Sequence, residues 1–464
     1  MSDPHPPHSA ARTDAPDKAQ VTPGARTVAL DLLQAVLRKG RPLDDTLERS
    51  SANTRLEARD RAFARLLAVT TLRRLGQIDA LIATFLDRPL KANARDVEDI
   101  LRLGLCQLLF LDTPAHAAVD TSVRLVAGRG HSFARGLVNA VLRRADREAR
   151  ERVADQDAPR LNTPDWLWQS WCRSYGEVPS RAIAEMHMRT PPLDITLREP
   201  ESAGIWAERL GGAVLPTGSV RLAGGGAISD MPGYDEGAWW VQDAAASLPA
   251  QLLMNAVPAN HGGFRIADLC AAPGGKTAQL AAMTGSRNGA EGGAEIHAVD
   301  TSPARLRKHD ANLHRLGLKS RTTVADVLSW RPAQAFDAIL LDAPCTATGT
   351  LRRHPDIAQL KTPDDVARLA RLQEALLAAS AHLVKPGGVL VYCTCSLEAE
   401  EGVEQTARFL EKHPAFIRLP VRAAEIGGIE AAVSAEGDLR TLPHHLGELG
   451  GMDGFYAARL RRSE

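Results

Sequence analysis

The chain has 464 residues, of which 44% are hydrophobic and 24% are charged, and its formal net charge is zero. This length predicts two to four domains, and a composition ordinary for a globular protein excludes a fibrous or wholly disordered chain. The six cysteines include no Cys-x-x-Cys pair, which argues against a zinc site and favours a reducing, cytoplasmic location.

The N-terminal part of the chain divides into a tail and a helical region. Residues 1–23 are rich in Pro, Ala, His and Asp, so we expect a disordered tail without a signal peptide or membrane helix. Residues 24–155 place apolar side chains at helical spacing, as at Leu30, Leu33 and Leu37, and show no strand-like alternation. This pattern predicts an all-α domain.

Charge is unevenly distributed along the chain. Between residues 24 and 150 there are 22 Lys and Arg against 15 Asp and Glu, a surplus of 7, so the remaining residues are on balance negative. A positive domain attached to an acidic one favours a polyanion-binding module joined to a catalytic body. A helical domain with surplus, solvated arginines is the alternative.

In the rest of the chain, the pattern of apolar residues changes near residue 261. Residues 160–260 carry six of the seven tryptophans and alternating segments such as Leu193–Leu197, which predicts a small α+β connector. From 261 to 464, apolar runs alternate with helix-length segments, which predicts a parallel α/β sheet covered on both faces. We expect Gly285–Glu295 to be a surface loop. The expected strands are Phe264–Leu269, Glu295–Val299, Thr322–Ala325, Phe336–Leu341 and Gly388–Tyr392.

A loop of small residues follows the first of these strands and opens a helix. Small residues let the backbone approach a ligand, and the N–H groups at a helix start favour a carboxylate or phosphate. Gly275-Lys276-Thr277 is similar to the end of a P-loop, but position 270 is Cys where that motif requires Gly. A purely structural turn is the other alternative. The candidate cofactor residues here are Cys270, Ala271, Ala272, Pro273, Gly274, Gly275 and Lys276.

Acidic residues close the following strands. Asp300 is suited to accept both hydroxyls of a ribose, and Asp326 to accept from an adenine amino group. Asp342 closes the strand Phe336–Leu341. Each acid alone could merely cap the next helix, but in this order they predict a dinucleotide-like or adenosylmethionine pocket along the carboxyl edge of the sheet.

Thiols gather at the same edge. Cys345 follows Asp342-Ala343-Pro344, and Cys393 and Cys395 follow the strand that ends at Tyr392. We expect Cys393 to be a buried apolar residue, and we expect Cys345 and Cys395 to take part in the reaction. Methylation of cytosine carbon 5 needs a thiolate that adds to carbon 6, a carboxyl group at the N3/N4 edge, and a group that helps the adduct collapse. Residue chemistry alone does not rank Cys345 and Cys395.

Three sequence blocks in this half resemble one enzyme family. DLCAAPGGKT, DAPCTATGTLRRHPDI and YCTCSLEAEEG are similar to the signatures of the Sun/nucleolar-protein family of RNA cytosine-C5 methyltransferases. The resemblance implies a class I, Rossmann-like methyltransferase domain at 261–464 with S-adenosylmethionine as cofactor. It departs from many members at Gly402, where they have Asn, and in the long loop Gly285–Glu295.

The same resemblance implies residue roles. Cys395 is implied to be the nucleophile, and Cys345 to assist product release. Asp342 is implied to face the cytosine as well as the cofactor, and Lys276 is a candidate for activating the thiol. The implied cofactor contacts are the loop 270–276, Asp300, Asp326 and Asp342.

The helical domain at 24–155 resembles the NusB fold, an RNA-binding module, in its stretches TPAHAAVD (113–120) and GLVNAVL (136–142). A NusB-like domain before this catalytic domain is similar to family members that methylate small-subunit ribosomal RNA. The resemblance implies RNA as partner. We expect neither DNA nor a membrane as partner, and we expect a monomer. The alternatives are a tRNA or large-subunit rRNA methyltransferase, a DNA cytosine methyltransferase, and a NusB-type RNA-binding or transcription factor with an inactive catalytic domain.

Overall fold

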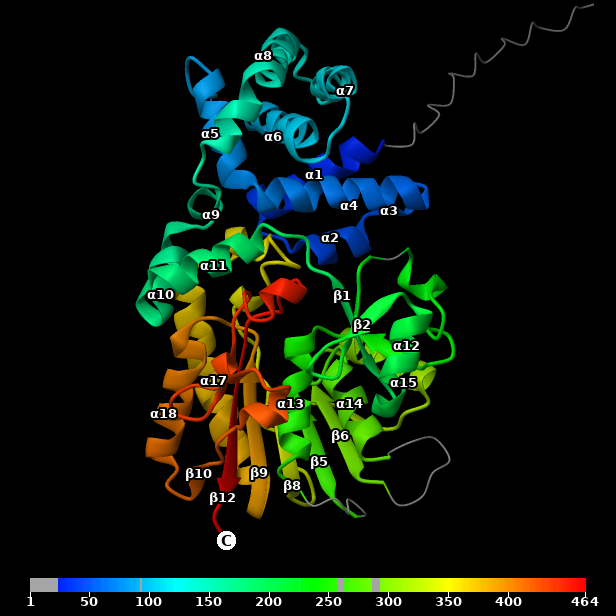
Figure 1. Ribbon diagram of the computed structural model, residues 1–464, viewed down its shortest axis with the longest axis vertical. Coiled ribbons are helices and arrows are strands. Elements are labelled where there is room, and N and C mark those ends of the chain that lie inside the picture. Colours follow the sequence, from blue (N-terminus) through cyan, green and yellow to red (C-terminus); the bar gives the residue numbers. More distant parts are fainter. Residues whose placement is uncertain (1–23, 92–93, 225, 258–262, 286–292) are drawn as a thin grey trace, which may run out of the picture.

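The computed structural model describes residues 24–91, 94–224, 226–257, 263–285 and 293–464. The predicted tail at 1–23 and most of the predicted loop at 285–295 lie outside these residues. Helices α1–α8 form one end of the molecule and the large sheet forms the other, with α10 and α11 beside the junction (Figure 1). No helix in the described part of the chain is long and apolar enough to cross a membrane.

The N-terminal region is a helical bundle, which confirms the predicted all-α domain. Leu30, Leu33, Leu67, Ile100 and Leu105 are fully buried in one core, and the helical spacing of these side chains puts them on the inner faces of their helices. The helices are α1 (Ala25–Lys39), α2 (Leu43–Arg49), α3 (Ser51–Thr54), α4 (Ala58–Arg73), α5 (Leu75–Phe85), α6 (Arg95–Phe110), α7 (Ala115–Gly128) and α8 (Arg135–Ala154).

The connector begins with helices and ends with a small antiparallel sheet. Strand β1 (Leu193–Leu197) has the bounds expected from its alternating pattern and lies between β3 and β4 in the order β2-β3-β1-β4. Its other elements are α9 (Ala158–Leu161), α10 (Asp165–Tyr175), α11 (Glu177–His187), α12 (Ala203–Arg209), β2 (Gly212–Val214), β3 (Val220–Leu222) and β4 (Trp239–Val241).

The large sheet has the order β10-β12-β9-β8-β5-β6-β7. Its parallel strands match the five predicted ones: β5 (Arg265–Leu269), β6 (Glu295–Asp300), β7 (Arg321–Val324), β8 (Phe336–Asp342) and β9 (Val384–Thr394). Buried residues of α13 (Ala244–Met254), α14 (Gly275–Met283) and α15 (Pro303–Leu316) share one core, and those of α17 (Pro363–Leu383) and α18 (Val403–Lys412) share the other. Both faces are therefore covered by helices, as predicted.

The C-terminal segment adds antiparallel strands, which the sequence analysis did not predict, to the predicted parallel ones. Strand β12 (Phe455–Arg462) pairs antiparallel with β9, and β10 (Phe416–Arg418) and β11 (Leu439–Thr441) pair antiparallel with β12. Tyr456 lies opposite Thr394, so β12 supports the end of β9 that carries the thiols. The physical reason is burial: Ala457 faces one core and Leu460 faces the other.

Candidate active site

The turn from β5 into α14 carries the predicted cofactor loop. Cys270 has a φ of 61° and Gly274 a φ of 105°, so the backbone takes two left-handed steps before α14 begins. A Cβ on Gly274 would lie 2.6 Å from the His309 ring, so both the space and the backbone conformation require glycine there. Among the described residues no side chain caps α14, which leaves its first N–H groups available to an anionic group.

Asp300 ends β6 and holds this loop in place. Its Oδ2 accepts a hydrogen bond from Ala272 N at 3.1 Å, and its Oδ1 accepts from Ser302 N at 2.9 Å. Asp300 as a whole residue is 4% exposed, so its carboxylate is buried. Arg305 Nη1 also lies 3.5 Å from Oδ2. Since a carboxylate offers about four lone pairs, these three contacts leave capacity for a further donor such as a ribose hydroxyl.

Asp326 lies beyond the end of β7 and is exposed. Its Oδ1 accepts from Leu328 N at 3.0 Å, and the neighbouring Ala325 N donates to the backbone oxygen of Asp300 at 3.1 Å. The structure therefore brings the two strand ends together. No side-chain hydrogen bond joins Asp326 to the loop 270–276 in the described chain.

Lys276 and Asp342 form an ion pair between the cofactor loop and the end of β8. The Nζ of Lys276 lies 2.8 Å from Oδ2 of Asp342 and 4.9 Å from the centre of the Phe455 ring. Burial alone would lower the pKa of Lys276, but the Asp342 carboxylate and the sulfurs of Cys393 and Cys395 more than offset it and raise that pKa. Lys276 therefore stays positively charged at neutral pH.

The two candidate reactive thiols lie side by side. Cys345 Sγ is 3.5 Å from Cys395 Sγ, and both residues are partly exposed. The hydrogen bond with Cys395, followed by burial and the charge of Glu401, raises the pKa of Cys345 well above its usual value. Cys345 is thus held as a neutral thiol.

The remaining cysteines of the site are less suited to chemistry. Cys393 is buried in β9, as the sequence predicted, and its Sγ donates to Oδ1 of Asp342 at 3.5 Å. Burial, followed by the Asp342 and Asp300 carboxylates, raises the pKa of Cys270 to about 12. Both thiols stay protonated at neutral pH.

The loop after Cys345 is tied to the strand end that bears Cys395. Gly349 N donates to Cys395 O at 2.9 Å, and Leu397 N donates to Thr348 Oγ1 at 2.9 Å. A Cβ on Gly349 would lie 2.0 Å from Gly454 O, so only glycine fits between these segments. The positions of the two thiols therefore depend on each other.

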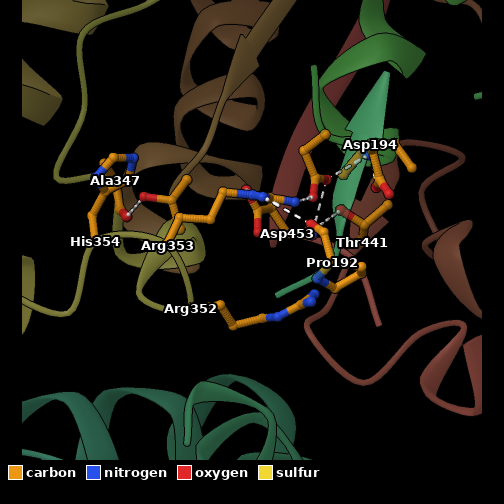
Figure 2. A network of polar contacts seen from close by, with 12 residues as sticks. Pro192, Asp194, Ala347, Arg352, Arg353, His354, Thr441 and Asp453 are labelled. Atoms are coloured by element: carbon orange, nitrogen blue, oxygen red, sulfur yellow. Dashed lines mark hydrogen bonds and ion pairs between the residues drawn. The ribbon is translucent and has the colours of Figure 1, made fainter. Parts of the chain in front are cut away.

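A buried polar network holds the next part of this loop (Figure 2). Arg353 lies 2.5 Å from an Asp243 oxygen and 3.0 Å from an Asp453 oxygen, and it donates to Pro192 O at 3.2 Å. Asp243 also caps α13 by accepting from Ala245 N. Arg353 thus joins the loop that follows Cys345, here called the thiol loop, to the connector and the C-terminal segment.

The sequence analysis did not select several residues that the structure places at this site. Asp268 is fully buried beneath the cofactor loop, and burial raises its pKa to about 7. Glu401 accepts from Thr346 N at 3.0 Å and so fixes the residue after Cys345. Their signal was an acid inside a motif block, but only the fold reveals which acids turn inward.

The fold and the site together define the class of the protein. A parallel sheet with a glycine-containing turn after β5 and acids at the ends of β6 and β8 is the arrangement of class I S-adenosylmethionine methyltransferases. The uncapped start of α14 suits the carboxylate of that cofactor, and the Asp300 carboxylate suits its ribose. Gly274 and Gly275 bring no side chain to the turn, which suits a close approach of the cofactor to the backbone.

Comparison with known proteins narrows this class. Residues 254–461 match the family described as 16S rRNA methyltransferase RsmB/F, and residues 23–147 match the NusB family. The probable ribosomal RNA small subunit methyltransferase B of Synechocystis is 35% identical over 95% of this chain and 99% of its own length. The ribosomal RNA small subunit methyltransferase B of Pseudomonas putida is 36% identical over 94% of this chain and 98% of its own.

A solved structure agrees with this assignment. The methyltransferase homolog protein of Pyrococcus horikoshii is 27% identical and superposes with a TM-score of 0.51 over 63% of this chain and 93% of its own. The chain belongs to the RsmB/F family of 16S rRNA methyltransferases. The predicted S-adenosylmethionine-dependent RNA methyltransferase with a NusB-like N-terminal domain is confirmed, while the roles of individual residues and the domain bounds stay predictions.

Proposed function

We propose that the protein methylates carbon 5 of a cytosine in small-subunit ribosomal RNA, acting as a monomer in the cytoplasm, with Cys395 as the nucleophile. The observation that carries the mechanism is the 3.5 Å separation of Cys345 Sγ and Cys395 Sγ next to the Lys276–Asp342 pair. The names of the relatives supply the substrate class. When bound, S-adenosylmethionine supplies the electrophilic methyl group, and we propose the loop 270–276, Asp300, Asp326 and Asp342 as its contacts.

The surroundings of the two thiols support different roles. Lys276 stays cationic, and Cys395 is among the groups whose charge acts on it, so a positive charge lies near the Cys395 sulfur. The Cys395 thiolate adds to carbon 6 of cytosine, which makes carbon 5 nucleophilic. Asp342, 31% exposed in its side chain, accepts from the N3/N4 edge of the base.

Cys345 is suited to the second half of the reaction. After methyl transfer a base removes the carbon-5 proton, the double bond re-forms, and the bond between carbon 6 and Cys395 Sγ breaks. Because its pKa is raised, Cys345 is a neutral thiol that donates to the departing Cys395 sulfur. Loss of Cys345 therefore leaves attack and methyl transfer intact but slows release.

The test compares the two single variants on labelled small-subunit ribosomal RNA. Cys395→Ala should abolish both methyl transfer and covalent attachment of RNA. Cys345→Ala should methylate but remain joined to RNA in denaturing electrophoresis. Adducts in Cys395→Ala and none in Cys345→Ala would assign the nucleophile to Cys345 instead, and full activity in both would contradict a covalent mechanism.

The substrate is tested separately from the mechanism. Incubating the enzyme with labelled cofactor and total RNA should label small-subunit ribosomal RNA. Label in tRNA or large-subunit RNA would correct the substrate and leave the mechanism standing. Bound RNA without any label would favour an RNA-binding factor with an inactive catalytic domain.

A further inference from the structure

The loop that carries Cys345 runs from the thiols to the side of the NusB-like domain that faces the catalytic domain. After Gly349 it passes through Arg352, His354 and Asp356 into the short helix α16 (Ile357–Leu360). Leu360 packs against the core of the NusB-like domain. The segment 345–360 therefore has one end in the active site and the other in a different domain.

The NusB-like domain contacts this segment at three alternate positions. Arg73 Nη2 donates to Arg352 O at 2.8 Å, and Leu43 N donates to Asp356 Oδ2 at 3.0 Å. Between them, Asp44 Oδ2 lies 3.2 Å from His354 Nδ1. The first two contacts are buried, so water does not replace them without cost.

A contribution to fold stability does not explain why an arginine is buried at position 73. The residue is 8% exposed, and among the described residues no carboxylate is seen to pair with it. Burial, and then the charges of Arg74, Arg65 and Arg352, lower the pKa of Arg73 to about 10. A buried cation without a counter-ion is costlier than an apolar side chain of similar volume. Its Nη2 donates to the carbonyl oxygen of Arg352, so this side chain fixes the loop.

The loop has room to shift when that contact is lost. A cavity of about 30 Å³ lies at the junction of the three parts of the chain, with Arg73, Leu351 and Pro355 in its lining. The cavity has space for about one or two water molecules, so the loop is not tightly packed on the side that Arg73 contacts. Such a shift reaches Gly349 within three residues of Arg352, and Gly349 N is bonded to Cys395 O.

We propose that Arg73 is a positioning residue for the methyl transfer reaction: through the carbonyl of Arg352 it holds the loop that places Cys345 against Cys395. This proposal rests on the function proposed above. It makes the NusB-like domain part of the catalytic framework in addition to any contact that it makes with RNA.

The test measures single-turnover rates, steady-state constants and adduct lifetime in the full-length enzyme with small-subunit ribosomal RNA. Arg73→Ala should lower kcat by roughly 10- to 100-fold, the scale expected for a reacting group displaced by about 1 Å. S-adenosylmethionine affinity and the KM for RNA should change less than about twofold, because the side chain is buried away from both. The covalent adduct should persist, as in Cys345→Ala, and Arg73→Lys should restore part of the rate.

Two further variants separate positioning from folding and from RNA binding. Asp44→Asn alters a side chain that is 45% exposed, so the domain should still fold. The substitution also makes the domain more positive, so a loss of positive charge cannot be the cause of any weaker RNA binding. It should still prolong the adduct, by up to about fivefold. The matched control is Arg74→Ala, which removes the same charge at the neighbouring position. Arg74 contacts Met188 of the connector and not the loop, so this variant should leave kcat unchanged.

The results distinguish this proposal from the function on which it rests. If Cys345→Ala traps RNA while Arg73→Ala and Asp44→Asn release it at the wild-type rate, the positioning role is wrong and the mechanism stands. If Arg73→Ala raises only the KM for RNA, the domain binds RNA and does not position the loop. If Cys345→Ala traps nothing, the release mechanism itself fails, whatever Arg73→Ala does.

Discussion

The cofactor loop and the thiol pair lie on the same edge of the sheet but are held in different ways. Ala272 and Asp300, which fix the cofactor loop, are 28 positions apart in the sequence, and Thr277 and Asp268 are 9 apart. The thiol loop is fixed by contacts 110 positions away at Asp243 and 279 away at Arg73. The cofactor loop is therefore a local structure, whereas the thiol pair depends on the assembly of the whole molecule.

The largest test of this contrast is Arg353→Ala. It leaves Asp243 and Asp453, 8% and 4% exposed, without their shared cation, so the free energy of unfolding should fall by about 3–5 kcal/mol. Denaturant titration measures this. Arg368→Ala, which removes an exposed partner of Asp365, should cost less than about 1 kcal/mol. An equal loss of unfolding free energy in both variants would mean that the buried Arg353 network does not stabilise the thiol loop.

Asp300→Ala tests the cofactor half. The change removes the carboxylate that accepts from Ala272 N and that we propose as the acceptor for the ribose, so S-adenosylmethionine binding should weaken by roughly 1–3 kcal/mol. Isothermal titration calorimetry gives the affinity, and Asp300→Asn, which keeps one acceptor oxygen, should lose less. Asp364→Ala, an exposed acid on α17, is the control. An unchanged affinity in Asp300→Ala would exclude this carboxylate from the cofactor site.

The smallest expected effect is a pH dependence at the contact of the two domains. The hydrogen bond with Asp44 raises the pKa of His354, and the same bond lowers the pKa of Asp44. The pair therefore stabilises the fold fully below the unfolded histidine pKa of about 6.5 and above the unfolded aspartate pKa of about 3.9. Its contribution disappears as pH rises through the folded pKa of His354, and also as pH falls through that of Asp44.

Both side chains are more than 40% exposed, so solvent screening limits the contribution to less than about 1 kcal/mol. Thermal unfolding of the wild type and His354→Gln should differ slightly at pH 5.5 and coincide at pH 8.5. A difference that is as large at pH 8.5 would show that the contact does not depend on the charge of His354.

The same contrast explains how far the sequence could be interpreted without a structure. Strands β5, β6 and β8 lie within one residue of their predicted bounds, because apolar runs and turn residues are local signals. Strand β12 escaped prediction because its arginines suggest an exposed segment. Arg459 is instead 5% exposed and pairs with Glu425 inside the fold.

The site shows the same division. The thiols, Lys276 and the strand-end acids were visible as motif residues. Arg353 stood in a motif block as well, but its partner Asp243 comes from the connector and its partner Asp453 from the loop before β12. Charges this far apart in the sequence carry no local pattern, so the ion pairs became visible only once the chain was folded.

The position of Gly454 has a consequence for the order of events during synthesis. Its N–H bonds to Gly349 O at 2.8 Å, and β12 follows it directly. A ribosome releases the NusB-like helices first and then the cofactor loop with Asp300, both of which find their partners nearby. At about 5–20 residues per second, Gly454 emerges roughly 8–30 s after Asp300. During that interval the nascent enzyme has its cofactor loop, but the thiol pair still lacks the Gly454–Gly349 hydrogen bond and the support of β12.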